Sequence, residues 1–163
     1  PEKETYLIPS NFEGHFRIIY GEKCGINPIF EDGRRVLKIP DNGILIIQPK
    51  FEAGIIDHEY YLVDKNGKRK KANTVLDFKQ QTTKFPRVEF RGSGSLGGAM
   101  PDGGLSSESP LAIHFADFNL YNKDINDQDE ITDYKLKQQF DSLTNVIVNK
   151  CRQKQTDVLD HNK

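Results

Sequence analysis

Residues Leu111–Phe118 read Leu-Ala-Ile-His-Phe-Ala-Asp-Phe, and large apolar side chains occupy every second position through most of this stretch. Successive side chains of an extended strand point to opposite faces. Leu111, Ile113 and Phe115 would therefore share one face, and His114 would lie on the other. This period of two predicts a β-strand with one buried face.

Other short apolar runs precede this stretch at intervals of about 8 to 15 residues. Gly, Pro, Asn and Asp separate them, and turns favour these residues. Asn66–Gly67 is a strong hairpin signal because both residues tolerate a positive φ. Short strands joined by such turns are typical of an antiparallel sandwich or barrel. The predicted strands are Thr5–Pro9, Phe16–Tyr20, Arg35–Ile39, Ile44–Ile47, Glu59–Val63, Lys68–Val75, Arg87–Arg91 and Leu111–Phe118.

The last third of the chain changes to helical spacing, with one apolar stripe. Acidic residues precede this segment and basic residues end it, which suits the helix dipole. We predict a helix over Asp133–Gln155, with Thr132 or Asp133 as its N-cap, packed on the sheet or across its open end. The stripe consists of Leu136, Phe140, Leu143, Ile147 and Cys151.

The predicted fold is mainly β: an antiparallel β-sandwich of about seven or eight strands with one C-terminal α-helix. The 163 residues suit one domain. Residues 1–4 are predicted to form a polar tether, 5–155 a single domain and 156–163 a frayed tail. At the level of fold analogy, the pattern resembles transthyretin-like sandwiches such as carboxypeptidase-associated regulatory modules, in which an acidic-Gly turn precedes a strand ending in Ile-Pro.

The charge of the chain is balanced, with 23 Lys and Arg against 24 Asp and Glu. No nucleic-acid partner is expected, because a net charge of −1 gives no broad positive field. The longest apolar run falls far short of the roughly 20 residues of a membrane span.

Cys24 and Cys151 either stay as two partly buried thiols, which is the favoured interpretation, or form one disulfide in an oxidising compartment.

Residues Gly92–Gly97 match Gly-x-Gly-x-x-Gly, the phosphate loop of dinucleotide-binding proteins. The following Gly98–Gly104 contains Pro and three Gly and cannot begin the helix that such a site needs. We therefore expect no cofactor. The Gly- and Ser-rich segment Gly92–Pro110 is predicted to be a mobile loop, which is either disordered or a binding loop.

No group of residues in the sequence has the spacing of a metal site or a catalytic site, and neither is predicted. Asp124–Glu130 resembles a calcium loop, but the EF-hand pattern fails at its sixth and twelfth positions, which favours an acidic turn. The four His are scattered, and no Gly-x-Ser-x-Gly elbow occurs. A hydrolase site assembled by folding around His58 or His114 is kept as an alternative.

The candidate binding residues are polar groups near strand ends and in the Gly-rich segment. For the charged residues near Glu31, a structural role in ion pairs is favoured over a role in a polar binding site. The basic run Lys65–Lys71 is interpreted as a solvated hairpin whose charges protect a sheet edge. The candidates are Arg34, Arg35, Ser93, Ser95 and His114.

Several spaced blocks in the first half of the chain resemble a family of small, uncharacterised bacterial cell-envelope proteins, many of them lipoproteins. The resemblance covers about Thr5 to Arg69 and brings no assigned activity with it. The blocks are Tyr6–Pro9 (Tyr-Leu-Ile-Pro), Phe12–Gly14 (Phe-Glu-Gly), Ile18–Tyr20, Glu31–Arg35 (Glu-Asp-Gly-Arg-Arg), Ile39–Pro40, Asn42–Leu45, Tyr60–Asp64 and Asn66–Arg69.

This resemblance implies an exported protein in the periplasm or at the cell surface, with a lipid anchor on a cysteine ahead of Pro1 as one form of attachment. The functional hypothesis is a non-enzymatic envelope domain that binds a protein, peptide or glycan partner through the Gly92–Pro110 segment or an exposed edge strand. The alternatives are the hydrolase and a structural envelope module without a ligand.

Overall fold

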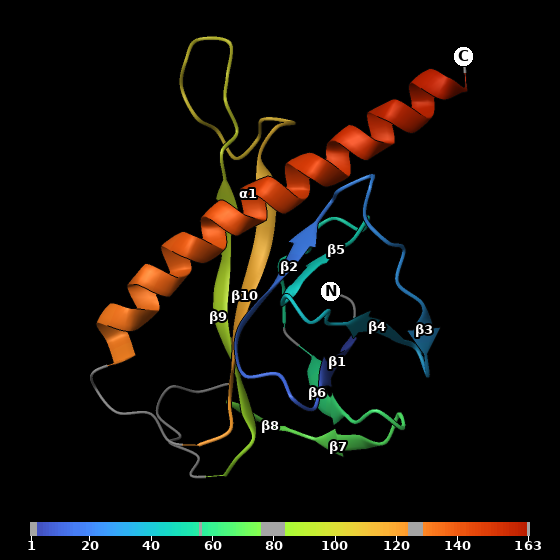
Figure 1. Cartoon of the computed structure of the whole chain (residues 1–163), viewed down its shortest axis with the longest axis vertical. Helices are drawn as coiled ribbons and strands as arrows, with labels where there is room; N and C mark the ends of the chain where they lie inside the picture. The colour runs from blue at the N-terminus through green and yellow to red at the C-terminus, as the bar shows by residue number, and fades with distance from the viewer. Residues whose placement is uncertain (1–2, 56, 76–83, 124–128, 163) are drawn as a thin grey trace.

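The computed structural model describes residues 3–55, 57–75, 84–123 and 129–162. Within these ranges ten strands form two five-stranded sheets, and one long helix crosses the second sheet (Figure 1). The mainly β sandwich with a C-terminal helix is thereby confirmed. Sheet A has the order β3 (Phe30–Glu31), β4 (Arg34–Lys38), β1 (Glu4–Pro9), β6 (His58–Val63) and β7 (Arg69–Lys71); sheet B has the order β5 (Ile44–Ile46), β2 (Gly14–Tyr20), β10 (Ile113–Tyr121), β9 (Arg87–Leu96) and β8 (Asn73–Val75).

Both sheets are mixed and contain parallel as well as antiparallel pairs, which the prediction of an antiparallel sandwich did not include. β1 runs parallel to β4 and β6, β2 to β5, and β8 to β9, whereas β10 is antiparallel to both of its neighbours. The cause is the path of the chain, which repeatedly crosses from one sheet to the other. A strand that returns to its sheet after such a crossing can arrive parallel to the earlier one.

The strand count exceeds the predicted seven or eight because one predicted strand is divided in two and one short strand was not predicted. The predicted return strand Lys68–Val75 splits at Ala72, where the chain leaves β7 in sheet A and enters β8 in sheet B. The Asp64–Gly67 turn joins β6 to β7 as predicted, with the Gly67 amide donating to the Asp64 carbonyl. β3 was not predicted, because two residues give no periodic signal.

The main core lies between the inner faces of the two sheets and is rich in aromatic rings. Phe16 and Phe118 stack with ring centroids 4.9 Å apart, and Tyr6 and Tyr60 approach from sheet A with centroids 4.9 Å apart. All four side chains are buried. Burying a large ring removes much apolar area from water, so these residues hold the sheets together.

Helix α1 (Asp129–His161) packs on the outer face of sheet B, and a second apolar cluster lies between them. The helix is longer than the predicted Asp133–Gln155: Thr132 and Asp133 lie within it rather than at an N-cap, and the predicted frayed tail is helical as far as His161. No helix in the described ranges is long and apolar enough to cross a membrane.

The contact face of α1 differs from the predicted stripe. Leu136 and Leu143 are exposed, whereas Thr144 and Val148 are fully buried. The face is rotated because sheet B presents the buried Arg17 to the helix. This guanidinium pairs with Asp117 through Nε at 2.6 Å and donates to the Thr144 hydroxyl at 3.1 Å. A pattern built from apolar residues alone could not include this polar contact.

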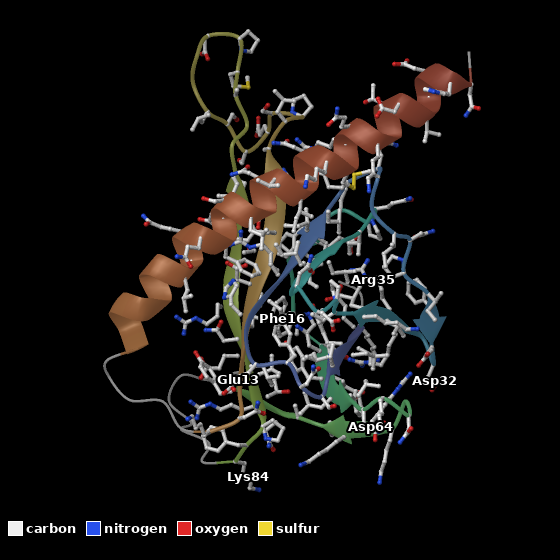
Figure 2. The ribbon with its side chains drawn as sticks, in the orientation of Figure 1. Glu13, Phe16, Asp32, Arg35, Asp64 and Lys84 are labelled. Atoms are coloured by element: carbon white, nitrogen blue, oxygen red, sulfur yellow. A yellow bond between two sulfur atoms is a disulfide. The ribbon has the colours of Figure 1, made fainter. Side chains whose placement is uncertain are left out.

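One disulfide and one ion pair hold the second half of α1 to the rest of the protein. Cys24 and Cys151 form a disulfide with Cα atoms 5.6 Å apart, so the interpretation as two thiols was wrong. Arg152, on the same part of the helix, pairs with Glu22 at 2.6 Å. Figure 2 shows the disulfide where the helix meets the body of the protein.

The Gly92–Pro110 segment is not the predicted mobile loop over its whole length. Gly92–Leu96 belong to β9, and the rest forms an ordered hairpin that projects beyond the sheets (Figure 1). The Ser106 amide donates to the Gly98 carbonyl at 2.9 Å. Gly98 has a φ of +87°, and a Cβ there would lie 2.2 Å from the Ser106 carbonyl oxygen, so this close approach requires glycine.

Candidate functional site

A cavity of about 230 Å³ lies between the sheets at the end where the β5–β6 connection crosses the opening. Sheet A contributes charged groups, sheet B contributes small and aromatic groups, and the connection contributes a flap of mostly exposed residues. The lining residues are Glu4, Arg35 and His58 from sheet A, Tyr20, Phe90, Ser93 and Ala116 from sheet B, and Phe51–Ile55 from the connection.

A buried carboxylate, that of Glu4, organises one wall of this cavity. Its Oε1 accepts hydrogen bonds from Nε and Nη2 of Arg35, with Nε at 3.1 Å. Its Oε2 accepts one from the Tyr6 hydroxyl at 2.5 Å and lies 3.1 Å from Nε2 of His58. Figure 2 shows Arg35 inside the molecule. Since Glu4 is only 3% exposed, these partners must satisfy its charge.

The register of sheet A explains how local sequence builds this wall. Glu4 and Tyr6 are two residues apart on β1, and His58 and Tyr60 are two residues apart on β6. β1 and β6 pair in parallel with Glu4 opposite His58 and Tyr6 opposite Tyr60. Residues two apart on a strand share a face, so all four side chains reach the inner side of sheet A.

Burial opposes the charge of Glu4, but hydrogen bonds from His58, Tyr6 and Arg35 outweigh it and lower the pKa of the carboxyl below its usual value. Burial raises the pKa of Tyr6, Tyr20 and Tyr60, and the charge of Glu4 adds to this effect. The wall at neutral pH therefore combines one carboxylate, one guanidinium and neutral phenols.

This arrangement predicts acid-sensitive stability. Because folding lowers the pKa of Glu4, its stabilising contribution is complete above the unfolded value of about 4.5 and is lost as pH falls through the lower folded value. Urea unfolding between pH 7 and 3 should show the loss. The ¹³C signal of the Glu4 carboxyl should titrate with a midpoint below 4.5. A midpoint above that value would contradict the hydrogen-bond network.

One guanidinium nitrogen of Arg35, Nη1, has no hydrogen-bond acceptor among the described residues. Nε and Nη2 bind Glu4. Arg35 is 7% exposed. Its Nη1 is not one of the side-chain atoms that are fully buried without a hydrogen-bond partner. Since Arg35 lines the cavity, a bound oxygen acceptor could pair with Nη1 there.

The cavity continues into a second hollow of about 340 Å³ on sheet B. Phe51 and Ser93 line both, and Ser95, Ser107 and His114 line only the second of these two. Phe51 is 39% exposed and meets Tyr20 edge to face with centroids 5.4 Å apart. An exposed aromatic ring thus stands at the junction of two hollows.

The structure brings four of the five candidate residues to these hollows. Arg35 and Ser93 line the cavity, and Ser95 and His114 line the adjoining hollow. Arg34 does not join them, because its guanidinium binds Asp57 at 2.9 Å. Glu31 pairs with Arg69 rather than with Arg34 or Arg35.

Three contributors were missed from the sequence: Glu4, Tyr20 and Phe51. Glu4 was placed in a polar tether, but it begins β1 and is buried. The pairs Glu4/Tyr6 and His58/Tyr60, each spaced by two in a strand, were the signal that could have linked these residues.

In the described ranges no group of three His, Cys, Asp or Glu side chains could hold a metal ion. Residues 124–128 of the calcium-like segment lie outside those ranges.

The comparisons with known proteins place this fold in a family. The model of a family of unknown function, DUF6843, matches residues 1–129. No curated protein matches the sequence. The crystal structure of a proposed lipoprotein from Bacillus anthracis is similar, with 18% identity, a TM-score of 0.55, and coverage of 88% of this chain and 95% of that chain.

At this identity the crystal structure shows a shared fold alone. The family match agrees with the expected membership in an uncharacterised family, while the signature of spaced blocks stays a prediction. Because the family model spans more than half of the sequence, the chain belongs to the family of unknown function DUF6843.

Proposed function

We propose that this chain is an exported, non-catalytic cell-envelope domain that binds a protein, peptide or glycan partner at the cavity between its sheets. One observation carries the proposal: a hollow between the two layers combines an exposed Phe51 ring with the nearly buried Arg35, whose Nη1 has no acceptor among the described residues. Apolar walls with a few placed polar groups are typical of ligand sites.

The disulfide supports export. Structural disulfides persist in oxidising compartments and are rare in the cytosol of most organisms. The Cys24–Cys151 bond joins the helix to the body across 127 positions, as expected for a protein that matures outside the cytosol. The likeness in fold to a proposed lipoprotein is consistent with an envelope location, at the surface or in the periplasm, with a lipid anchor as one form of attachment.

A hydrolase is the second candidate, because His58, a carboxylate and Ser93 line the same cavity. The geometry does not favour it. Nδ1 of His58 lies 2.9 Å from the Tyr60 hydroxyl, and Nε2 lies 3.1 Å from Glu4. Both ring nitrogens are therefore engaged, and neither is left to take a proton from Ser93. Hydrolysis of p-nitrophenyl acetate should be the same for the protein and its His58→Ala variant.

Binding at the cavity can be tested with two small probes, N-acetylglucosamine and the capped pentapeptide acetyl-Thr-Val-Gln-Val-Thr-amide. In ¹⁵N-detected NMR titrations, at least one probe should shift the amide signals of Phe51, His58 and Ser93 in a saturable way. The Ser93→Leu variant should weaken this binding at least tenfold, because the added side chain enters the cavity.

Ser142→Leu is the matched control, because it makes the same change at an exposed position on α1 that lines neither the cavity nor the adjoining hollow. It should change the affinity less than threefold. If neither probe shifts these signals, or if Ser93→Leu and Ser142→Leu act alike, the cavity is not the binding site and the structural module without a ligand is favoured.

A further inference from the structure

Next to the cavity, half of β9 is a sheet edge without a partner strand among the residues that the structure describes. β8 pairs only with Arg87–Glu89, whereas β10 pairs with β9 along its whole length. Among the described residues no strand lies on the other side of Gly92–Leu96 (Figure 1). In an antiparallel ladder, every second residue of such an edge directs its amide and carbonyl groups away from its partner. These groups can accept another strand.

This edge carries neither Lys nor Pro between Gly92 and Leu96, the residues that often protect an edge against strand pairing. Natural edges are kept short or carry Lys or Pro, as β7 does with Arg69–Lys71. Gly92–Leu96 instead reads Gly-Ser-Gly-Ser-Leu, and Ser93, Gly94 and Ser95 are exposed. Small side chains leave room for a neighbouring backbone, so an extended segment could approach without a steric barrier.

The edge and the cavity meet at Ser93. Ser93 pairs with Ala116 on β10, and both residues line the cavity. A strand added beside β9 would place alternate side chains on the same face as Ser93, about 5 Å from it. One of these side chains would lie next to Ser93, at the opening of the cavity that Phe51 and Arg35 also line.

We propose that an extended peptide segment of a partner protein adds to sheet B along Gly92–Leu96 and places one side chain, carrying an oxygen acceptor, in the cavity. This inference rests on the proposed function and selects a peptide among its three classes of partner. The backbone hydrogen bonds supply affinity without regard to sequence, and the cavity supplies specificity.

The charges of the cavity indicate which side chain fits. Glu4 already neutralises Arg35, so an added carboxylate would meet a paired guanidinium and a buried negative charge. An uncharged amide carbonyl can accept from Nη1 without that repulsion, while its methylene groups contact Phe51 and Phe90. A central Gln is therefore expected to bind more tightly than a central Glu.

The experiment uses acetyl-Thr-Val-Gln-Val-Thr-amide and an analogue that is N-methylated at each Val, which removes two backbone donors on one edge of the strand. A second analogue is methylated at the other three residues. One analogue should bind at least tenfold more weakly than the parent peptide, because a strand pairs along only one of its edges. Hydrogen exchange of alternate amides within Gly92–Leu96 should slow in the complex.

Two further results distinguish failure of this inference from failure of the proposed function. If N-acetylglucosamine shifts the cavity signals and the parent peptide does not, or if the parent peptide and both methylated analogues shift them without slowing exchange in β9, the cavity binds ligands but strand addition is wrong. If no probe shifts the signals, both proposals fall. If the β9 amides are already protected in a concentration-dependent dimer without peptide, the occupant is a second copy of the chain and the inference is overturned.

Discussion

Replacing Cys24 and Cys151 together with Ser should lower the free energy of unfolding by about 3–5 kcal/mol. The bond closes a long loop, since the two residues are 127 positions apart. Cross-linking such distant residues removes many conformations from the unfolded chain, and in the chain-entropy model the effect grows with loop length. Urea unfolding of the oxidised protein and of the double Ser variant measures the difference.

Reduction supplies the control for this variant. Dithiothreitol should lower the stability of the natural sequence to a value near that of the double Ser variant and should leave the variant itself unchanged. The fold should persist, because the Glu22–Arg152 and Arg17–Asp117 pairs still fasten the helix. A difference below about 1 kcal/mol would mean that the bond does not constrain the unfolded chain as the loop length predicts.

The Arg17→Met variant should lose about 3–5 kcal/mol of stability. Arg17 is fully buried and holds Asp117 through two hydrogen bonds, at 2.6 and 2.9 Å. Removing the guanidinium leaves the Asp117 carboxylate, itself 5% exposed, without its main partner. Met retains much of the apolar stem, so the loss reports the missing guanidinium, including its position 3.8 Å over the centroid of the Phe115 ring, rather than a large void.

The double variant Arg17→Met/Asp117→Leu is the matched comparison. Replacing a whole buried ion pair by apolar groups is often neutral or stabilising, whereas breaking it is costly. The double variant should therefore be more stable than Arg17→Met alone. If the second substitution adds to the loss instead, the position requires the polar network that also includes Thr144 and Asp141.

The local elements could be predicted because their signals are local. The strands at Thr5–Pro9 and Phe16–Tyr20 and the Asn66–Gly67 turn follow from periodicity and turn chemistry, and the structure has them. Strand direction is not local. Nothing within β1 indicates that it pairs in parallel with both β4 and β6, because that depends on where the chain goes between them.

The contact face of the helix and the residues of the cavity could not be predicted for a related reason, because both depend on contacts between distant parts of the chain. Leu136 and Leu143 fit an apolar period but stay 52% and 41% exposed, while Thr144 is buried where Arg17 reaches it from sheet B. Likewise, Glu4 lies in a polar N-terminal segment whose composition is typical of a tether. Only its partners, more than 30 positions away in the case of Arg35, make its burial stable.

Co-crystallisation with acetyl-Thr-Val-Gln-Val-Thr-amide tests whether the cavity between the sheets is a binding site. We expect an added strand beside Gly92–Leu96, with the Gln side chain in the cavity and its carbonyl oxygen within hydrogen-bonding distance of Nη1 of Arg35. A complex in which the peptide lies elsewhere, and in which Phe51 closes an empty cavity, would contradict it.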